Sequence, residues 1–528
     1  MGEARLLVMG YQGTLRPAQR QNLPAVFESL LQPWLAQASQ LLNQRIPGQQ
    51  RIFQGEPIPL ESLLLLLEDR LIGMLTQVLR ASGNASFEPS ANKIADEFPL
   101  LSSLMRHAVS EWAAAVGTFL QRLHRDQSWL AGAMPGGKLL PIESVSGAAS
   151  DIHSGGHFVL RVGFSGGGCL YYKPRPLTGE WLWHGLLNVI AGLDPHLSLP
   201  TSRVFTREID GRYGWATSVL PDEKFSEAPV PAATEYWHAA GAMLCLAQHA
   251  RLTDLHLANI IATPRGPAVT DAECFATPTL SQPRPPMSGP HVPIVLDAFE
   301  AILATGLLPR KQDSNLPEVS GLFGHAAPVP GIRLSAWSLS SDGRYDLNPV
   351  AAELVDHGNT PVQTTPTTVL AQMLSGYRHA ADLLIRARRT LLAPGSQWRS
   401  VLEKKHAPRF VLRDTLTYGC LLSQSLEPQS LRSNYRRRNV VLTELQSYPN
   451  HNFVAAVMRA ECNAILHLHV PRFTILPGSR TVGSGSGRVL TRRFATSTPD
   501  QSVLQSIESL TSGSVENLHV PALLAAIL

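Results

Sequence analysis

The positions of apolar side chains predict that the chain begins with a helical region. Between about residues 20 and 135, apolar residues recur every three or four positions, the spacing that places them on one face of a helix. Segments 27–35 and 101–116 show this spacing most clearly. We therefore predict a helical N-terminal region over residues 1–149.

The pattern changes to short β-prone runs near residue 157. Segments 157–164 and 169–173 are separated by Ser165-Gly166-Gly167-Gly168, which predicts a β-hairpin with a Gly-rich turn. Helical spacing then returns, and two short apolar runs follow it on either side of a Pro-Arg-Gly turn. We predict a small mixed α/β unit over residues 150–276.

The remaining residues, 277–528, are predicted to be largely helical. The best helical candidates are segments 294–307, 368–392 and 432–468. A Pro- and Gly-rich stretch, 308–367, separates the first two, and the Gly- and Ser-rich stretch 478–487 predicts an exposed, flexible loop. The three regions together predict an α+β fold class.

Composition places the chain among folded globular proteins. Hydrophobic residues make up 44% and charged residues 16% of the 528 residues, which excludes a disordered or collagen-like polymer. The formal net charge is only +4, so no nucleic-acid partner is expected. The densest basic stretch, Arg436-Arg437-Arg438, is more typical of a solvated helix face than of a phosphate-binding patch.

Cysteine usage and the lengths of the apolar runs indicate a cytoplasmic protein. The five cysteines lie far apart and include no Cys-x-x-Cys pair, which fits a reducing compartment. The most apolar run, 63–67, is flanked by charged residues and is far too short to span a membrane. The first residues form neither an export signal nor a myristoylation motif. We therefore expect a cytoplasmic location and no membrane span.

The strongest chemical signal is the segment from Thr253 to Asn259, followed by a D-x-E element, Asp271 to Glu273. Phosphoryl transfer needs a carboxylate near the acceptor hydroxyl, and an amide oxygen and a second carboxylate on magnesium. Asp254, Asn259 and Asp271 supply these groups. Asn259 follows Asp254 by five positions and Asp271 follows Asn259 by twelve, the spacing of a kinase catalytic loop and its magnesium-binding strand end.

A lysine that could reach the same phosphates stands on an earlier strand. Lys173 ends the second strand of the predicted hairpin, whose Gly-rich backbone is expected to cover the nucleotide. Taken singly, Asp254 could cap a helix and Asn259 could form a turn. The ordered set favours phosphoryl transfer with ATP and Mg²⁺ as cofactors. Glu273 is its weakest member, because an acidic residue after a strand can simply face water.

Two groups of residues could suggest zinc. His153 and His157 stand four positions apart and could bind a metal together with Asp151 on a helix, but Gly155-Gly156 argues against a helix there. We expect Asp151 and His153 to line the nucleotide site instead, and we expect no zinc. A second group, on a half-buried helix and its exit, is assigned no function: Cys462, His467 and His469.

At these residues the chain resembles the dehydratase domain of class II lanthipeptide synthetases, the LanM type. Five further motifs carry the resemblance beside the T-D-x-H-x-x-N loop: an S-D-x-H-x-x-G segment (Ser150 to Gly156), a Y-K-P-R-x-L segment (Tyr172 to Leu177), Gly214-Trp215, the D-x-E element, and R-x-x-x-R-x-T-x-x-Y (Arg409, Arg413, Thr415 and Tyr418). Weaker similarity extends from Phe27 to Phe473, so the resemblance covers nearly the whole chain.

The resemblance implies an ATP-dependent dehydratase with a lipid-kinase-like, two-lobed catalytic core and extensive helical additions. Such enzymes phosphorylate Ser and Thr of a ribosomally made precursor peptide that carries a leader sequence, and then eliminate phosphate to leave dehydroalanine or dehydrobutyrine. By resemblance, the residues for phosphorylation and magnesium–nucleotide binding are Lys173, Asp254, His256, Asn259, Asp271 and Glu273. Arg409 and Thr415 would serve elimination, and Asp151 and His153 would line the same site. The base for elimination stays open, with His256 as one candidate.

Three positions depart from the family pattern, namely Ala258, Thr217 and His469, and they put substrate contacts and nucleotide geometry in question. The ligands of a zinc-dependent cyclase domain are also missing, so we expect a stand-alone dehydratase, as in proteusin-type pathways, with separate cyclase or other modifying enzymes as partners. Two alternatives stay open. One is a kinase of a small molecule or lipid that never eliminates phosphate, and the other is an inactive peptide-binding scaffold.

Overall fold

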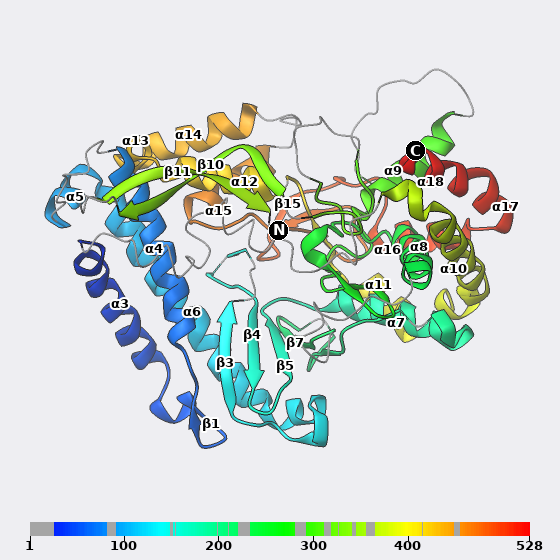
Figure 1. Ribbon diagram of the computed structural model, residues 1–528, viewed down its shortest axis with the longest axis horizontal. Coiled ribbons are helices and arrows are strands. Elements are labelled where there is room, and N and C mark those ends of the chain that lie inside the picture. The colour runs from blue at the N-terminus through cyan, green and yellow to red at the C-terminus, as the bar shows by residue number, and fades with distance from the viewer. Residues whose placement is uncertain are drawn as a thin grey trace.

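The computed structural model describes residues 26–81, 91–147, 151–153, 155–197, 199–209, 211–219, 233–279, 292–310, 318–325, 327–339, 345–354, 365–413, 415–447 and 455–528. Helices and several small sheets alternate along these residues, so the predicted α+β class is confirmed. In Figure 1 the N-terminal helices lie at the left, a sheet stands below the centre, and a second group of helices lies at the right. Among the described residues, no helix is both long enough and apolar enough to cross a membrane.

The N-terminal region is built on one long helix, α6 (Pro99–Leu130), whose apolar face is buried along its whole length. The other elements of this region are α3 (Val26–Arg45), β1 (Ile52–Phe53), β2 (Glu56–Pro57), α4 (Glu61–Ala81) and α5 (Ala91–Glu97). These are the helices that the three- and four-residue spacing predicts. Their apolar faces share one core with the central sheet.

The central sheet is antiparallel, with strand order β3-β4-β5-β7-β6. Its strands are β3 (Ile142–Gly147), β4 (Leu160–Phe164), β5 (Cys169–Lys173), β6 (Val204–Phe205) and β7 (Gly214–Thr217). The predicted hairpin is β4 and β5. Strands β6 and β7 have only two and four residues and were not predicted, and β3, which lies in the region predicted to be helical, was not predicted either. The sheet therefore begins before residue 150.

Asp126 fastens this sheet to α6. Its side chain is fully buried, and its Oδ2 accepts hydrogen bonds from the Tyr213 hydroxyl at 2.8 Å and from Trp215 Nε1 at 3.0 Å. Arg207 Nε donates to the other oxygen of the same carboxylate. A buried carboxylate is stable only when such donors satisfy it. The Gly214-Trp215 motif thus has a structural role, because it docks the sheet against the long helix.

A second core forms around the helices at the right of Figure 1. They are α7 (Thr178–Leu193), α8 (Ala233–His249), α9 (Val292–Ala304), α10 (Leu370–Leu391), α11 (Gln397–Lys404), α16 (Pro499–Glu508), α17 (Ser512–Ser514) and α18 (Val520–Ile527), with the hairpin β8 (Ile260–Thr263) and β9 (Gly266–Val269). Helices α8 and α10 approach so closely that glycine is required on both. A Cβ on Gly376 would lie 1.8 Å from His238 O, and one on Gly241 would lie 2.0 Å from Met373 O.

The C-terminal part contains a second sheet, with strand order β12-β13-β14-β15. Its strands are β12 (Arg409–Phe410), β13 (Phe473–Ile475), β14 (Val482–Ser484) and β15 (Val489–Thr491). The prediction of an exposed loop over 478–487 is therefore wrong for its middle, since Val482 and Gly483 are buried in β14. The alternation in three-residue strands is too short to be recognised from sequence.

Two further parts of this region differ in how well they were predicted. The helices of this region are α12 (Thr415–Ser425), α13 (Pro428–Leu431), α14 (Asn434–Ser447) and α15 (Ala455–Leu466). The helical candidate 432–468 corresponds to two of them, α14 and α15. The Pro- and Gly-rich stretch, in contrast, contains a long antiparallel hairpin that was not predicted, β10 (Ala327–Leu339) and β11 (Tyr345–Leu354).

The interpretation of Arg436-Arg437-Arg438 as a solvated helix face is wrong for the middle residue. Arg436 and Arg438 are exposed, but Arg437 is buried. Its guanidinium donates to Ser425 O at 2.9 Å and Leu466 O at 2.7 Å, which are the last residues of α12 and α15. The terminal carbonyl groups of a helix have no partner within the helix. Arg437 therefore supplies a cap to two helices at once.

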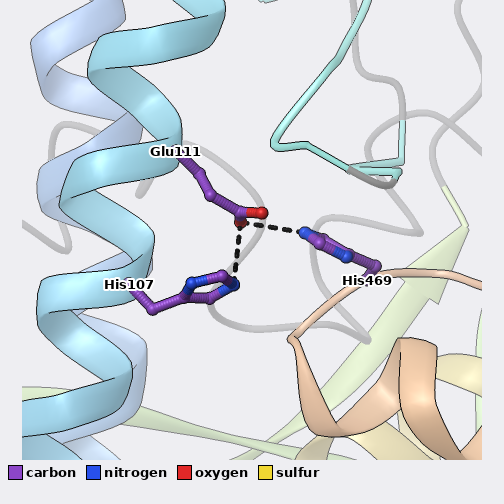
Figure 2. Close-up of side chains that lie close together, drawn as sticks. All are labelled: His107, Glu111 and His469. Carbon is purple, nitrogen blue, oxygen red and sulfur yellow. Dashed lines mark hydrogen bonds and ion pairs between the residues drawn. The ribbon is translucent and has the colours of Figure 1, made fainter.

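The residues Cys462, His467 and His469, which were assigned no function, have separate environments. Cys462 is buried within α15, and His467 is exposed just after it. His469 is buried and faces His107 and Glu111 of α6, as Figure 2 shows. The histidine that departs from the family pattern is thus paired with the N-terminal region.

The close contact of α8 and α10 predicts the effect of a methyl group. Gly376→Ala should destabilise the protein by about 1–3 kcal/mol, because the two helix backbones must separate to accommodate it. The free energy of unfolding in urea measures this. Gly192→Ala is the matched control, since Gly192 lies exposed in α7 with no atom near the added Cβ, and it should change stability by less than about 1 kcal/mol. Equal stabilities of the two variants would contradict the close packing.

Candidate functional site

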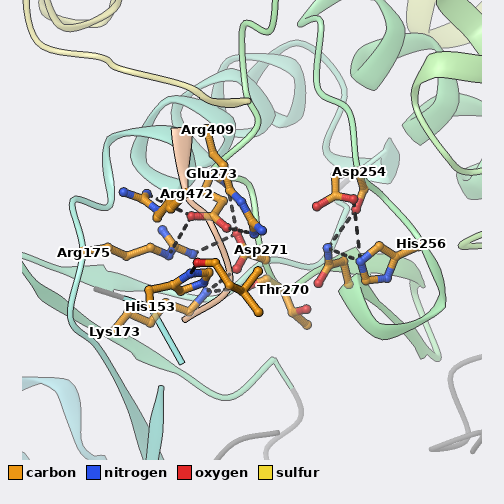
Figure 3. Close-up of polar contacts among 12 residues, drawn as sticks. His153, Lys173, Arg175, Asp254, His256, Thr270, Asp271, Glu273, Arg409 and Arg472 are labelled. Carbon is orange, nitrogen blue, oxygen red and sulfur yellow. Dashed lines mark hydrogen bonds and ion pairs between the residues drawn. The ribbon is translucent and has the colours of Figure 1, made fainter. Parts of the chain in front are cut away.

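Lys173 lies where the central sheet meets the end of β9. As the last residue of β5 it is buried, and its Nζ donates to Thr270 O at 2.7 Å and to Glu180 Oε1 at 3.1 Å. Asp271 Oδ2 is 4.0 Å from the same nitrogen. The predicted lysine and the D-x-E element, far apart in sequence, are thus adjacent in space (Figure 3).

Glu180 is a site residue that sequence reasoning missed. It lies in the first turn of α7 and is buried, with the Arg175 guanidinium at 2.6 Å and Lys173 Nζ at 3.1 Å. Burial alone would raise the pKa of Glu180, but the charges of Arg175 and Lys173 outweigh burial and lower the pKa to about 2. An acidic residue at the start of a helix seven positions after the lysine is the signal that could have found it.

Glu273 holds three arginines together. Arg409 Nη1 donates to Oε1, Arg472 Nη2 donates to Oε2 at 3.0 Å, and Arg175 Nε is 3.3 Å from Oε2. Burial opposes ionisation of this carboxyl, yet the three guanidinium groups hold the pKa of Glu273 well below its usual range. The weakest member of the predicted set is therefore the centre of an ion network.

Arg175 and Arg472 were not predicted as site residues: Arg175 stands in the Y-K-P-R-x-L motif, and Arg472 lies next to the end of the weaker similarity at Phe473. Arg175 bridges the carboxylates of Glu180 and Asp271, with Nη2 at 2.8 Å from Asp271 Oδ1. Arg472 comes from the segment just before β13 and so joins the second sheet to the D-x-E element. The signal that could have found them is an arginine within the family resemblance, because an arginine that is largely removed from solvent needs carboxylate partners.

The Asp254 loop lies beside this network, on the right of Figure 3. Asp254 has a left-handed backbone (φ 65°), and its carbonyl oxygen accepts a hydrogen bond from Asn259 Nδ2 at 2.8 Å. His256 Nδ1 accepts the Ala258 N–H at 3.2 Å, and its Nε2 lies 3.3 Å from Asn259 Nδ2 and 3.8 Å from Asp254 Oδ1. The loop residues predicted to act together are therefore close neighbours.

A distant segment fixes the backbone of this loop. Leu255 N–H donates to Thr305 O at 2.8 Å, and Leu257 N–H donates to Val319 O at 2.9 Å. Gly306 adopts a left-handed conformation (φ 81°), and a Cβ there would lie 3.1 Å from Leu255 N. The segment around Gly306 thus supports the loop from behind.

Asp151 and His153 reach the network from the opposite side. His153 Nδ1 donates to Val470 O at 3.0 Å, which leaves the lone pair of the ring on Nε2. Burial and the positive charge of Arg409 lower the pKa of His153 to about 4, although nearby carboxylates oppose this. Ser150, the first residue of the motif, lies outside the described residues.

Several of the side chains described above line a pocket of about 170 Å³. Its lining residues are Asp151, His153, His157, Phe158, Val159, Pro174, Arg175, Asp271, Glu273, Arg409, Arg472 and Gly485. The Gly-rich turn 165–168 is not among them, because it lies at the other end of β5 from Lys173. The role of the hairpin in covering a nucleotide stays a prediction, and this pocket is lined instead by His153 and His157, on either side of Gly155-Gly156.

Only part of the R-x-x-x-R-x-T-x-x-Y motif lines the pocket. Arg409 faces the pocket, whereas Arg413 and Tyr418 both bind the buried carboxylate Oε1 of Glu461, at 2.8 and 2.9 Å. Thr415 is the first residue of α12, two positions after Arg413. Its side chain lies outside the described residues. Arg413 and Tyr418 fix the start of the helix on which Thr415 stands.

Two of the three positions that depart from the family pattern, Thr217 and Ala258, make defined contacts in the fold. Thr217 lies at the end of β7, where its Oγ1 accepts the Arg203 N–H at 3.0 Å. Ala258 lies inside the loop, and its N–H fixes the ring of His256. Neither substitution removes a member of the Glu273 network.

Comparison with known proteins agrees with the motifs. The family model described as "Domain of unknown function (DUF4135)" matches residues 98–475. The lacticin 481/lactococcin biosynthesis protein LcnDR2 of Lactococcus lactis subsp. lactis is 20% identical over 425 residues, which cover 75% of this chain and 43% of that protein. The chain thus matches less than half of the length of this relative. The range matched by the family model includes every residue of the pocket except Gly485.

The ion pairs of Glu180 predict a pH-dependent stability. Glu180→Gln should lower the free energy of unfolding by about 3 kcal/mol at pH 7, because Lys173 and Arg175 lose a buried counter-charge. A carboxyl with a lowered pKa stabilises the fold above its unfolded pKa and loses that effect as the pH falls toward its folded pKa. The difference between wild type and variant should therefore shrink as pH falls from 4.5 toward 2.

Urea denaturation at several pH values measures this difference. Glu403→Gln is the control, because Glu403 pairs with Arg399 on the surface of α11 and its loss should cost about 0.5 kcal/mol or less. A difference between wild type and Glu180→Gln that stayed constant down to pH 2 would contradict the assigned ionisation.

Proposed function

The chain belongs to the DUF4135 family, the domain of LanM-type lanthipeptide synthetases, and on that basis we propose that it dehydrates Ser and Thr of a precursor peptide. The reaction has two steps, transfer of a phosphoryl group from ATP to the hydroxyl and elimination of the resulting phosphate. The curated relative, named as a lacticin 481/lactococcin biosynthesis protein, supports a peptide substrate.

One observation carries the proposal, the convergence of three arginines on Glu273 within one pocket. Guanidinium groups bind phosphate in a bidentate manner, and here they are already partly buried and oriented by Glu273. A phosphate group that enters the pocket can replace part of the Glu273 carboxylate as their partner. The same pocket holds Asp271 and borders Lys173, which are the groups that phosphoryl transfer needs.

The loop residues account for the first step. Asp254 would accept the proton of the Ser or Thr hydroxyl, while Lys173 would neutralise charge on the transferred phosphates. His256 Nε2 lies 3.8 Å from Asp254 Oδ1, so a proton on this nitrogen would orient the carboxylate. MgATP supplies the phosphoryl group and the metal charge that stabilises it.

Asn259 and Asp271 would hold the magnesium ion. Both offer oxygen ligands, which magnesium prefers, and donation of the Asn259 amide N–H to Asp254 O leaves its Oδ1 as the ligand. Glu273 was also expected to bind magnesium, but its carboxylate faces three guanidinium groups. We therefore propose that Glu273 orients Arg409 and Arg472 instead.

The second step breaks the bond between Cβ and the phosphate oxygen after a base removes the Cα proton. Arg409 would stabilise the departing phosphate, with Thr415 as a further donor. His153 suits the base better than His256. The lone pair of His153 is on Nε2 in a ring that lines the pocket, whereas His256 does not line the pocket and its Nε2 faces the Asn259 amide and Asp254.

Product analysis tests the two steps. The protein is co-expressed with each short, Ser- and Thr-containing peptide encoded beside its gene, and the peptides are weighed by mass spectrometry. Wild type should give the loss of one water per modified residue. Asp254→Asn should give unchanged peptide, because the acceptor hydroxyl loses its base, with a rate at least about 100-fold lower.

Arg409→Lys should instead accumulate phosphopeptide, since lysine keeps the charge but lacks the bidentate guanidinium. Thr415→Ala should give the same product. Arg436→Lys, on the exposed face of α14, is the matched control and should behave like wild type. Phosphopeptide as the end product of wild type would favour a kinase that never eliminates, and unchanged peptide without Mg-dependent ATP binding would favour a binding scaffold.

The state of His153 predicts a pH profile for elimination. Purified phosphopeptide is supplied, and the rate of phosphate elimination is measured for wild type and for His153→Gln. The ratio of the two rates is used, because the ionisation of the substrate affects both rates equally. Because the pKa of His153 is lowered to about 4, this ratio should be about 100 or more and constant from pH 8 to pH 5, and should fall toward pH 4. A ratio near one would exclude His153 as the base.

A further inference from the structure

Three potential metal ligands converge outside the pocket, as Figure 2 shows. His107 and Glu111 stand four positions apart on α6 and share one face of that helix, and His469 approaches from the segment after α15. Glu111 Oε2 is 2.8 Å from His469 Nε2 and 3.3 Å from His107 Nε2, and one donor atom from each residue lies within 4.8 Å of the others.

The donor set is typical of zinc. Two imidazole nitrogens and one carboxylate oxygen form a common three-ligand zinc site that keeps a further coordination position open. Magnesium is a poor match, because it prefers an all-oxygen shell. The i, i+4 spacing on a helix is itself a frequent way to bring two zinc ligands together.

His107 is already disposed as a ligand. Its Nε2 is buried and, although close to Glu111, makes no hydrogen bond to any described residue. A buried nitrogen without a hydrogen-bond partner costs free energy, and a metal ion would satisfy it.

The backbone around His469 is held in place. Leu468 adopts a left-handed conformation (φ 61°), which is unfavourable for leucine and persists only where neighbours enforce it. Arg70 Nη2 donates to Leu468 O at 3.1 Å, and the His469 N–H donates to Ala464 O at 3.0 Å. These bonds turn the imidazole toward α6, so the ligands come from rigid elements.

The cluster borders a second pocket and adjoins the segment before the central hairpin. His469 borders a second pocket of about 340 Å³, which shares Arg472 and Gly485 with the first. On the other side, Gly156 lies so close that a Cβ on it would be 2.7 Å from Glu111 Cβ. The cluster therefore adjoins the segment that carries Asp151 and His153.

We propose that His107, Glu111 and His469 form a zinc site whose remaining position opens toward the second pocket. The site departs from the expectation of no zinc, and it is independent of the proposed dehydration chemistry. Zinc here would tie α6 to the chain between α15 and β13, where Val470 O also accepts the His153 hydrogen bond. Sequence reasoning missed it because Glu111 and His469 are 358 positions apart.

A competition titration tests the site. The full chain is stripped with a chelator and titrated with Zn²⁺ against a chromophoric zinc indicator, and bound metal is counted by elemental analysis. Wild type should bind one equivalent. His107→Ala, His469→Ala and Glu111→Gln should each weaken binding by at least about tenfold, because each removes one of three ligands. His467→Ala is the matched control, since His467 is exposed, stacks on His469 and is not one of the three, and it should keep wild-type affinity.

Thermal unfolding adds a readout that does not depend on activity. Zinc should raise the melting temperature of wild type and of His467→Ala, and should leave the three ligand variants unchanged, because only a folded site binds the metal. The conservative Glu111→Gln keeps the side-chain volume if the alanine variants fold poorly. Absence of stoichiometric zinc binding by wild type, equal affinity in Glu111→Gln, or tighter binding of Mg²⁺ than of Zn²⁺ would overturn the proposal.

Discussion

The ion pairs of the largely buried Glu273 carboxylate are the interaction on which the rest of the site depends. Glu273 stands at the end of the D-x-E element. It binds Arg409 of strand β12, Arg472 just before strand β13, and Arg175 just after strand β5. None of these guanidinium groups could be buried alone, because an uncompensated charge in a protein interior is costly. One side chain therefore joins three parts of the fold, and it also places the cations of the pocket.

The same arrangement explains how a pocket so rich in arginine is stable. Asp271 and Glu180 balance the remaining charge of Arg175 and Lys173. Each guanidinium is thus oriented by the carboxylates around it. Preorganised charge of this kind is what the proposed function requires, because it needs little rearrangement to act on an anion.

Helix α6 is the second element that positions the site. Asp126 near its C-terminal end receives the hydrogen bonds that dock the central sheet, and Glu111 near its middle meets both Gly156 and His469. The sheet brings Lys173, and the segment around Gly156 brings His153. The long N-terminal helix is therefore part of the framework of the site, although it carries no residue that lines the pocket.

The sequence by itself determined the chemical types and their order, because Lys173, Asp254, Asn259 and Asp271 follow one another at spacings that local structure imposes. It also predicted the longer helices, whose apolar periodicity extends over many turns. The tertiary structure decided the rest. The partners of Glu180 and Arg472, the burial of Arg437 and the meeting of Glu111 with His469 depend on contacts between distant segments. The short strands β12 to β15 could not be predicted either, because two or three residues leave no periodic signal and only their pairing defines them.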